Sequence, residues 1–407
     1  MNNRNDMNKH IIVLTSIYLG KPSANGICAH NIVNELVNRG YYVDVICYES
    51  KEIYTKEDYV NIFTIQYDNK RKSMFKRVVE RIQMIFGSSS FATNKCLVKM
   101  YYNRIMEIIS HEFQVEAIIG MFFPLEAIEA LYRVKRKFGI PTIFYELDSI
   151  GDGIAKTQIN TALDKAYGKW LTKMYSNANY IIVMKSHRDY WNETFGKMYS
   201  SKVRFADIPV LKFNKTHSSY NRNNCIVMVY SGLLEEQYRS PRYALKTLEA
   251  CKDILGVHFK CLFYSRGDCE DFLAEYSVNH QFVIPKGYVS PDVLETVFEN
   301  TDVFISIGNT SSNSLPSKLI AYISYGKPII HFTNQNSDIC VKYLENYPLA
   351  LIVNQQVSLT DNARSIYDFL KKVKDKQVDK DYIDDMYEMN TPRYSCDLIE
   401  ECIINAQ

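Results

Sequence analysis

The stretch that decides the fold is residues 302–330, DVFISIGNTSSNSLPSKLIAYISYGKPII. An apolar run at 303–307 predicts a buried parallel strand, and residues 308–314 form a polar loop of small side chains. Residues 316–326 begin with Pro and end with Gly, which suit the first position and the C-cap of a helix. A second apolar run at 329–332 predicts the next strand. Together they form a βαβ unit, the building block of a doubly wound sheet.

Ser317 and Lys318 occupy the opening turn of this helix, at the carboxyl edge of the predicted sheet. The unpaired N–H groups and the dipole of a helix start favour an anion, and Lys318 adds a full charge. A phosphate or diphosphate is the ligand that this arrangement suits. The alternative is a plain crossover helix with an exposed lysine, and the spacing alone leaves both interpretations open.

The motif N-x-x-P-S-K-(hydrophobic)₂-x-Y-x₃-G-K-P resembles the donor-site segment of GT-B glycosyltransferases of the family-4 type, and is most similar to bacterial capsule and surface-polysaccharide enzymes. The resemblance implies that Ser317 and Lys318 hold the diphosphate of a nucleotide-sugar, with Asn313 beside them. The chain departs from the family at Asn313 and Ala321, where the family carries glutamates, one of which binds the nucleotide ribose. These departures keep a second hypothesis open, a catalytically weak homologue that acts as a partner subunit.

Length and composition favour an ordinary two-domain globular protein. The chain has 407 residues, too many for one hydrophobic core, and its net charge of +2 gives no overall attraction to nucleic acid. Ten cysteines occur without a C-x-x-C pair, which favours a reduced, cytoplasmic environment. The first apolar stretch, 11–14, is too short for a signal peptide, and no run reaches the ~20 apolar residues of a membrane span.

The chain opens with a strand at 11–14, a glycine-containing loop, a helix at 27–39 and a strand at 41–48. The loop lacks G-x-G-x-x-G, which argues against a dinucleotide enzyme or epimerase. The opening resembles that of GT-B enzymes, which implies that Gly20 and Gly26 border the cleft and that His30 is a catalytic candidate. The alternative for His30 is a helix-surface or partly packed histidine.

Acidic residues end the strand predicted at 142–147. Glu146 and Asp148 stand where ligands bind in open α/β sheets, and Asp148 matches the family's His-Asp position. Both are therefore catalytic candidates that orient the acceptor or stabilise positive charge on the sugar. The alternatives are helix N-capping for Asp148 and an exposed edge position for Glu146.

A polar segment at 212–224 predicts the interdomain linker, and strands alternate with helices from 225 to 355. The resemblance supplies further donor-site candidates at the ends of these strands. They are Gly232, Arg239, Arg266 and Lys286.

Two charged segments have alternative interpretations. Residues 70–86 predict a basic amphipathic helix, which suits either an anionic membrane surface or an ordinary surface position with its apolar face in the core. Residues 379–381 spell D-x-D but follow no strand, so we expect a solvated helix there and no metal site.

The sequence therefore predicts an α/β protein of the GT-B type, with two Rossmann-like doubly wound domains that face a central cleft. The domains are 1–211, which binds the acceptor, and 225–375, which binds the donor, with a helical segment at 376–407 packing back on the first domain. The expected activity is metal-independent, retaining transfer of a sugar, preferably from a UDP-sugar, to a glycan or lipid-linked acceptor during surface-polysaccharide or glycolipid assembly. No further cofactor is expected, and the expected location is the cytoplasm or the inner membrane surface.

Overall fold

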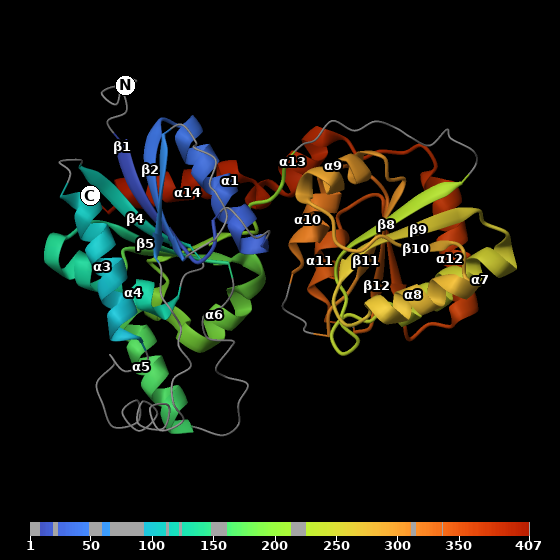
Figure 1. The fold of residues 1–407 in the computed structure, drawn as a ribbon, viewed down its shortest axis with the longest axis horizontal. Coiled ribbons are helices and arrows are strands. Elements are labelled where there is room, and N and C mark those ends of the chain that lie inside the picture. Colours follow the sequence, from blue (N-terminus) through green and yellow to red (C-terminus); the bar gives the residue numbers. More distant parts are fainter. Residues whose placement is uncertain are drawn as a thin grey trace. The chain divides into compact units, whose positions relative to one another are not determined.

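The computed structural model divides the chain into two compact units, Met1–Pro209 with Met389–Gln407, and Val210–Glu388 (Figure 1). The residues that it describes are 9–18, 23–48, 59–65, 93–110, 114–121, 124–147, 161–212, 225–310, 315–335 and 337–406.

The first unit contains a seven-stranded parallel sheet in the order β3-β2-β1-β4-β5-β6-β7. Its central strands are mostly apolar, because both faces of a doubly wound sheet are covered by helices. The chain order reverses between β1 and β4, which are neighbours in the sheet. The strands are β1 (Lys9–Thr15), β2 (Tyr41–Tyr48), β3 (Val60–Ile65), β4 (Val115–Met121), β5 (Thr142–Glu146), β6 (Tyr180–Met184) and β7 (Val203–Ala206).

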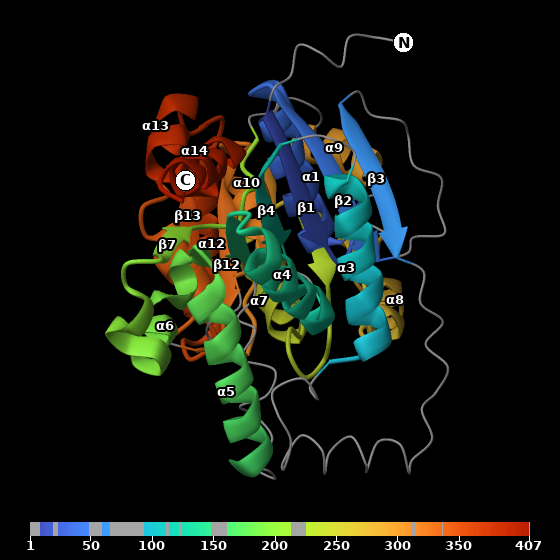
Figure 2. The ribbon, with the colours of Figure 1, turned by 90° about the vertical axis from the view of Figure 1, so that its left-hand side faces the viewer.

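Helices cover both faces of this sheet (Figure 2). The core on one face joins α3, α4 and α5 to inward-facing strand residues such as Ile12, Ile118 and Phe144. On the other face α1 packs against α14, the last helix of the chain. The helical segments are α1 (Ala24–Asn38), α3 (Lys95–Ile109), α4 (Leu125–Phe138), α5 (Thr161–Asn177), η3 (Lys185–His187), α6 (Arg188–Phe195), η4 (Gly196–Tyr199) and α14 (Pro392–Ile404).

Polar contacts fix α14 in the first unit. The Arg39 guanidinium at the end of α1 lies 2.7 Å from Asp397 and 2.6 Å from Glu400. On the inner side of α14, the hydroxyls of Ser395 and Tyr145 lie 2.9 Å apart within the core. The C-terminal helix is therefore an integral part of the first unit.

The second unit contains a six-stranded parallel sheet in the order β10-β9-β8-β11-β12-β13. Its strands are β8 (Ile226–Leu233), β9 (Phe259–Arg266), β10 (Val283–Pro285), β11 (Val303–Ile307), β12 (Ile329–Thr333) and β13 (Ala350–Asn354). Its helical segments are α7 (Arg242–Leu255), α8 (Glu270–Asn279), α9 (Pro291–Glu299), α10 (Ser317–Ile323), α11 (Ile339–Leu344), α12 (Leu359–Val373) and α13 (Lys380–Met386), and η5 (Glu388–Asn390) follows at the boundary between the units.

The predicted α/β class with two doubly wound sheets is confirmed by this topology. One detail at the deciding stretch is wrong: Pro316 is the N-cap of α10 with extended backbone, and the helix begins at Ser317. The structure also divides the segment predicted at 376–407, since α13 lies in the second unit and α14 in the first. As expected, the D-x-D segment opens a helix, where Asp379 accepts hydrogen bonds from the N–H groups of Asp381 and Tyr382.

Candidate functional site

The second sheet has a topological switch point between β8 and β11. β8 pairs with β9 on one side and β11 on the other, so the loops that leave β8 and β11 lead to helices on opposite faces. Such a divergence opens a crevice at the carboxyl edge, where open α/β sheets bind their ligands. The two loops meet here, because the Thr310 N–H donates to the Tyr238 carbonyl over 2.9 Å.

Arg239 lies in the loop after β8 and is half-buried at this edge. Its side chain hydrogen-bonds to the Tyr230 hydroxyl, whose pKa is raised to about 12 by burial although the Arg239 charge partly offsets this. The Arg239 Nε is buried and has no acceptor among the described residues. A cation with an unsatisfied donor at the switch point suits an anionic ligand.

Tyr322 connects α10 to the end of β8. Its ring stacks on Phe304 with centroids 4.3 Å apart and an interplanar angle of 7°. Its buried hydroxyl accepts from the Ser231 N–H over 2.7 Å and donates to the Ser231 carbonyl over 3.1 Å. The tyrosine of the motif therefore fixes α10 against the end of β8, from which the loop that carries Arg239 leaves.

Ser317 and Lys318 are the first two residues of α10. Burial lowers the pKa of the Lys318 ammonium, and the Glu295 carboxylate on α9 offsets part of this effect. The ammonium also lies 5.7 Å from the centre of the Phe298 ring. A poorly solvated ammonium gains more from an anionic ligand than a fully hydrated one does.

The second lysine of the motif has a different role. Lys327 is buried, and its Nζ donates to the carbonyls of Phe298 and Glu299 over 3.0 and 2.6 Å. These carbonyls lie in the last turn of α9, where a lysine satisfies groups that the helix leaves unpaired. Lys327 is therefore a structural cap.

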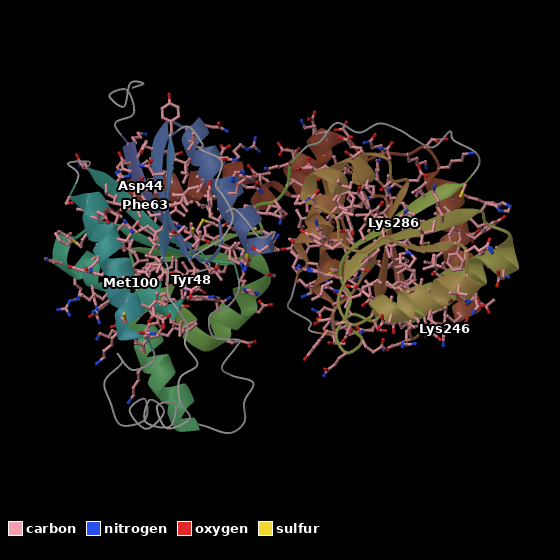
Figure 3. All side chains as sticks on the ribbon, in the orientation of Figure 1. Asp44, Tyr48, Phe63, Met100, Lys246 and Lys286 are labelled. Carbon is pink, nitrogen blue, oxygen red and sulfur yellow. The ribbon has the colours of Figure 1, made fainter. Side chains whose placement is uncertain are left out.

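The other predicted donor-site residues lie at the same edge of the sheet. Gly232 is near the end of β8, and Arg266 ends β9 with its guanidinium carbon 5.7 Å from the Tyr288 ring centre. Lys286 follows β10 and is exposed, with its N–H bound to the Phe263 carbonyl (Figure 3). Asn313 lies outside the described residues.

Glu146 ends β5 in the first unit, and the interpretation as an exposed edge residue is wrong because it is 2% exposed. The Tyr175 hydroxyl donates to its Oε1, and its Oε2 has no partner among the described residues. Burial raises the pKa of Glu146 to about 8, although the bond from Tyr175 lowers it. At neutral pH this side chain is mostly the neutral acid.

His30 lies half-buried on α1. Its Nε2 is 3.0 Å from the Asn34 amide nitrogen, and its ring packs against Tyr18 with centroids 5.6 Å apart. Gly26 is in the first turn of α1, where its N–H donates to the capping hydroxyl of Ser23. Three further predictions fall outside the described residues, namely Gly20, Asp148 and the basic segment 70–86.

Sequence reasoning missed a buried polar group beside the switch point. Ser306, His331 and Asp338 form a hydrogen-bonded chain below the loop after β11. Their only sequence signal is polarity inside or beside apolar runs, since residues 303–307 and 329–333 are otherwise nearly all apolar. Buried polar side chains at the carboxyl end of a sheet are frequently functional.

Comparison with solved structures identifies the fold. The lipopolysaccharide outer core galactosyltransferase WaaB matches 98% of this chain and 100% of its own, with a TM-score of 0.57 and 12% identity. HepE of Anabaena, solved with UDP, matches 98% of this chain and 100% of its own (TM-score 0.59, 11% identity). TarM matches 98% of each chain (TM-score 0.61, 9% identity).

These likenesses show that the chain has the GT-B fold, in which two Rossmann-like units follow one another. No protein-family model matches the sequence, and no curated protein matches it significantly. Within the described residues, none of the helices combines the length and hydrophobicity that crossing a bilayer requires.

Proposed function

We propose that this protein is a glycosyltransferase that moves a sugar from a nucleoside-diphosphate donor to an acceptor hydroxyl. The observation that carries the proposal is the switch point of the second sheet, where Arg239 has a buried Nε without an acceptor among the described residues and Lys318 lies in the first turn of α10. The GT-B fold supports it, since HepE was solved with UDP and with UDP-glucose. A UDP-sugar is the preferred donor.

The proposed chemistry depends on where negative charge develops during sugar transfer. When the bond between the sugar and the diphosphate breaks, negative charge grows on the leaving oxygens. Arg239, Lys318 and the N–H groups near Ser317 stabilise that charge if the diphosphate binds at the switch point. These groups do the work of a metal ion, so the proposed reaction is metal-independent.

The proposed acceptor side lies in the first unit. Glu146 carries little negative charge at neutral pH, because its pKa is raised to about 8 by burial. This favours Asp148 as the carboxylate that orients the acceptor or stabilises positive charge at the sugar, with His30 as a further candidate. The resemblance to family-4 enzymes supports retention of configuration and an acceptor from surface-polysaccharide or glycolipid assembly, near a membrane surface that residues 70–86 contact.

Isothermal titration of the full chain with UDP-, GDP-, ADP- and CMP-sugars tests the donor site. We expect one nucleotide to bind, and Lys318→Ala to weaken that binding by about 1–3 kcal/mol, the range of a charge-assisted contact. Lys246→Ala is the matched control, because Lys246 is an exposed cation on α7 (Figure 3). If folded protein binds none of the four classes, or if both variants lose affinity equally, the donor-site proposal is wrong.

The partner-subunit hypothesis remains a second candidate because Ala321 is a half-exposed residue of α10 at the position where the family carries a ribose-binding glutamate. A transfer assay with the bound donor separates the two hypotheses. Turnover by the isolated chain supports the enzyme, whereas donor binding with turnover only after addition of another glycosyltransferase supports the partner subunit.

A further inference from the structure

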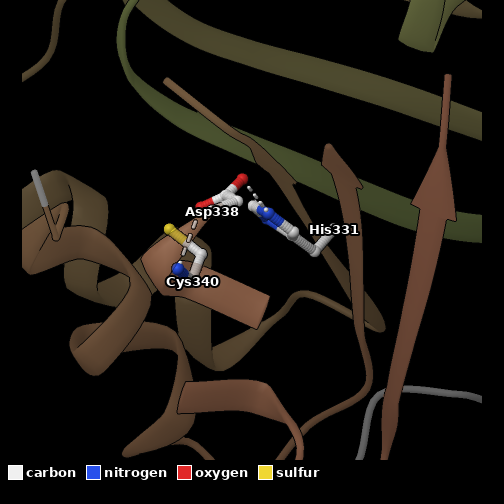
Figure 4. A group of neighbouring side chains, drawn as sticks. All are labelled: His331, Asp338 and Cys340. Atoms are coloured by element: carbon white, nitrogen blue, oxygen red, sulfur yellow. Dashed lines mark hydrogen bonds and ion pairs between the residues drawn. The ribbon is translucent and has the colours of Figure 1, made fainter. Parts of the chain in front are cut away.

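Three buried side chains form a continuous hydrogen-bonded chain across β11, β12 and the start of α11. Ser306 Oγ lies 2.9 Å from His331 Nδ1. On the other side of the ring, His331 Nε2 lies 2.9 Å from Asp338 Oδ2 (Figure 4). None of the three side chains is more than 6% exposed, so each of these bonds is made away from water.

The charge state of Asp338 determines the direction of the hydrogen bonds in this network. Burial by itself favours the neutral acid, but bonds from His331, the Cys340 N–H and Thr333 hold the pKa of Asp338 below its usual value. An ionised carboxylate only accepts hydrogen bonds, so His331 Nε2 carries the proton that points to Asp338. In the neutral ring, Nδ1 then accepts a hydrogen bond from the Ser306 hydroxyl.

This network lies directly against the loop that follows β11. A Cβ at Gly308 would stand 2.2 Å from Asp338 Oδ2, so only glycine allows the loop to lie this close. The Gly308 N–H donates to the Phe332 carbonyl over 2.8 Å, and the Gln335 amide donates to the Asn309 carbonyl over 2.6 Å. Residues 308–310 therefore lie between the network and the loop that carries Arg239. Thr310 contacts this loop, because its N–H donates to the Tyr238 carbonyl.

We propose that Ser306, His331 and Asp338 are positioning residues that hold residues 308–310, beside the loop of Arg239, in the geometry that binds the donor diphosphate. The inference rests on the proposed donor site and assigns these residues no contact with the donor. It explains why polar groups interrupt two apolar strands at the switch point: their hydrogen bonds fix one loop conformation, which packing of apolar side chains alone does not do.

A metal site is the competing interpretation of part of this group. The ligand atoms of His331, Asp338 and Cys340 lie within 4.8 Å of one another. However, both nitrogens of His331 already have hydrogen-bond partners, and Asp338 Oδ1 accepts the Cys340 N–H at the start of α11. A bound zinc ion would need to replace the bond between His331 Nε2 and Asp338. The geometry therefore favours a satisfied polar network.

The test uses two variants that break the network and one that preserves it. Ser306→Ala and Asp338→Ala each remove one end. Asp338→Asn preserves the hydrogen-bonded network. The carbonyl oxygen of the new side chain accepts the Cys340 N–H, and its amide group donates to His331 Nε2. His331 then adopts its other tautomer, in which the Nδ1–H donates to Ser306. Tyr347→Phe is the control, because it removes a buried hydrogen bond of 2.8 Å to the Lys327 carbonyl, before β12 begins.

Hydrogen exchange of residues 308–310 in the full chain is the first measurement. We expect exchange to accelerate at least tenfold in Ser306→Ala and Asp338→Ala, and to stay unchanged in Asp338→Asn and Tyr347→Phe. Unchanged exchange in the first two variants, or equal acceleration in Tyr347→Phe, would overturn the inference. So would stoichiometric zinc in the purified protein that is lost in Cys340→Ser.

Titration with UDP, GDP and ADP is the second measurement. Ser306→Ala and Asp338→Ala should raise the dissociation constant at least tenfold, while Asp338→Asn and Tyr347→Phe stay near wild type. Faster exchange with unchanged affinity would show that the loop is held for another purpose and would overturn the link to the donor. If the wild type binds none of the three nucleotides, the proposed donor site fails, and the exchange data still decide whether the network holds the loop.

Discussion

Tyr322 is the residue that most clearly gives the deciding motif a physical meaning. The sequence indicates only that it belongs to the apolar face of a helix, and its ring does stack on Phe304 in the core. Its hydroxyl, however, bonds to both backbone groups of Ser231, which is 91 residues away. Such a contact cannot be predicted from local spacing, because it depends on which strand the topology places beside β11.

Removal of this hydroxyl should destabilise the second unit. In Tyr322→Phe the Ser231 N–H is left buried without its partner, at a cost of about 1–3 kcal/mol in the free energy of unfolding. Tyr382→Phe is the control, since Tyr382 is 37% exposed and its hydroxyl bonds to the Asn346 carbonyl near solvent. Denaturant unfolding that gives equal losses for the two variants would contradict the assigned role of Tyr322.

Glu146 should make the stability of the first unit depend on pH. Its pKa rises from 4.5 to about 8 on folding, because burial disfavours the charged form. Between these values the folded state holds a proton that the unfolded state has released. The free energy of unfolding therefore falls as pH rises, by at most about 1.4 kcal/mol per pH unit. The contribution is full below pH 4.5 and is lost as pH passes the folded pKa.

Chemical denaturation of Glu146→Gln from pH 4 to 9 measures this effect. The variant should lose most of the pH dependence, and it should gain stability relative to the wild type toward high pH. Tyr175→Phe removes the hydrogen bond that lowers the pKa of Glu146, so the fall in stability should extend to higher pH. An unchanged pH profile in Glu146→Gln would show that Glu146 does not keep its proton in the folded protein.

At the scale of elements, the sequence predicts best the strands that are buried on both faces. Val303–Ile307 is predicted to the residue, because all of its side chains except that of Ser306 are apolar. The edge strands β3 and β7 of the first sheet are not predicted. The residues of these two strands are largely half-buried, so their sequences lack the apolar run that identifies a central strand.

The end of the β8–β9 pair depends on one glycine. Gly267 has φ of +124°, and a Cβ there would stand 2.0 Å from the Leu234 carbonyl oxygen. The Leu234 N–H donates to the Arg266 carbonyl over 2.9 Å, so the clash falls where β8 and β9 end beside the switch point. A side chain at residue 267 must therefore separate the two strand ends.

A side chain in this backbone conformation costs about 1–3 kcal/mol by itself. Because the clash with Leu234 adds to this cost, Gly267→Ala should lower the free energy of unfolding of the second unit by more than that. Gly256→Ala supplies the comparison, since Gly256 has φ of +61° but open space around its Cβ position, and about 1 kcal/mol is expected there. The measurement is the free energy of unfolding of both variants. Equal losses would mean that the backbone at Leu234 moves aside without cost.

At the scale of the whole molecule, the chain returns to its first unit at the end. Residues 376–407 read as one helical segment in the sequence, but α13 packs in the second unit, where the Tyr387 hydroxyl donates to the Tyr343 carbonyl. α14 packs against α1 in the first unit. Composition does not mark the point of return, because both helices mix charged and apolar residues. The contacts of α14 with first-unit residues such as Arg39 and Tyr145 reveal it.

This return predicts that the last helix contributes to the stability of the first unit alone. Ile399 on α14 is fully buried, so Ile399→Ala should reduce the free energy of unfolding of the first unit by about 2–5 kcal/mol through lost apolar contact and a cavity. Ile404→Ala is the matched control, because Ile404 is 71% exposed on the same helix, and we expect an effect below about 0.5 kcal/mol.

Hydrogen exchange resolved by peptide distinguishes the two units in this experiment. Ile399→Ala should accelerate exchange in β1, β2 and β4, more than 270 residues earlier in the chain, and leave β8, β11 and β12 unchanged. Acceleration in both sheets would mean that the units unfold together as one cooperative body. Acceleration limited to α14 itself would mean that the helix detaches without loosening the first sheet, which its buried contacts with α1 and Tyr145 argue against.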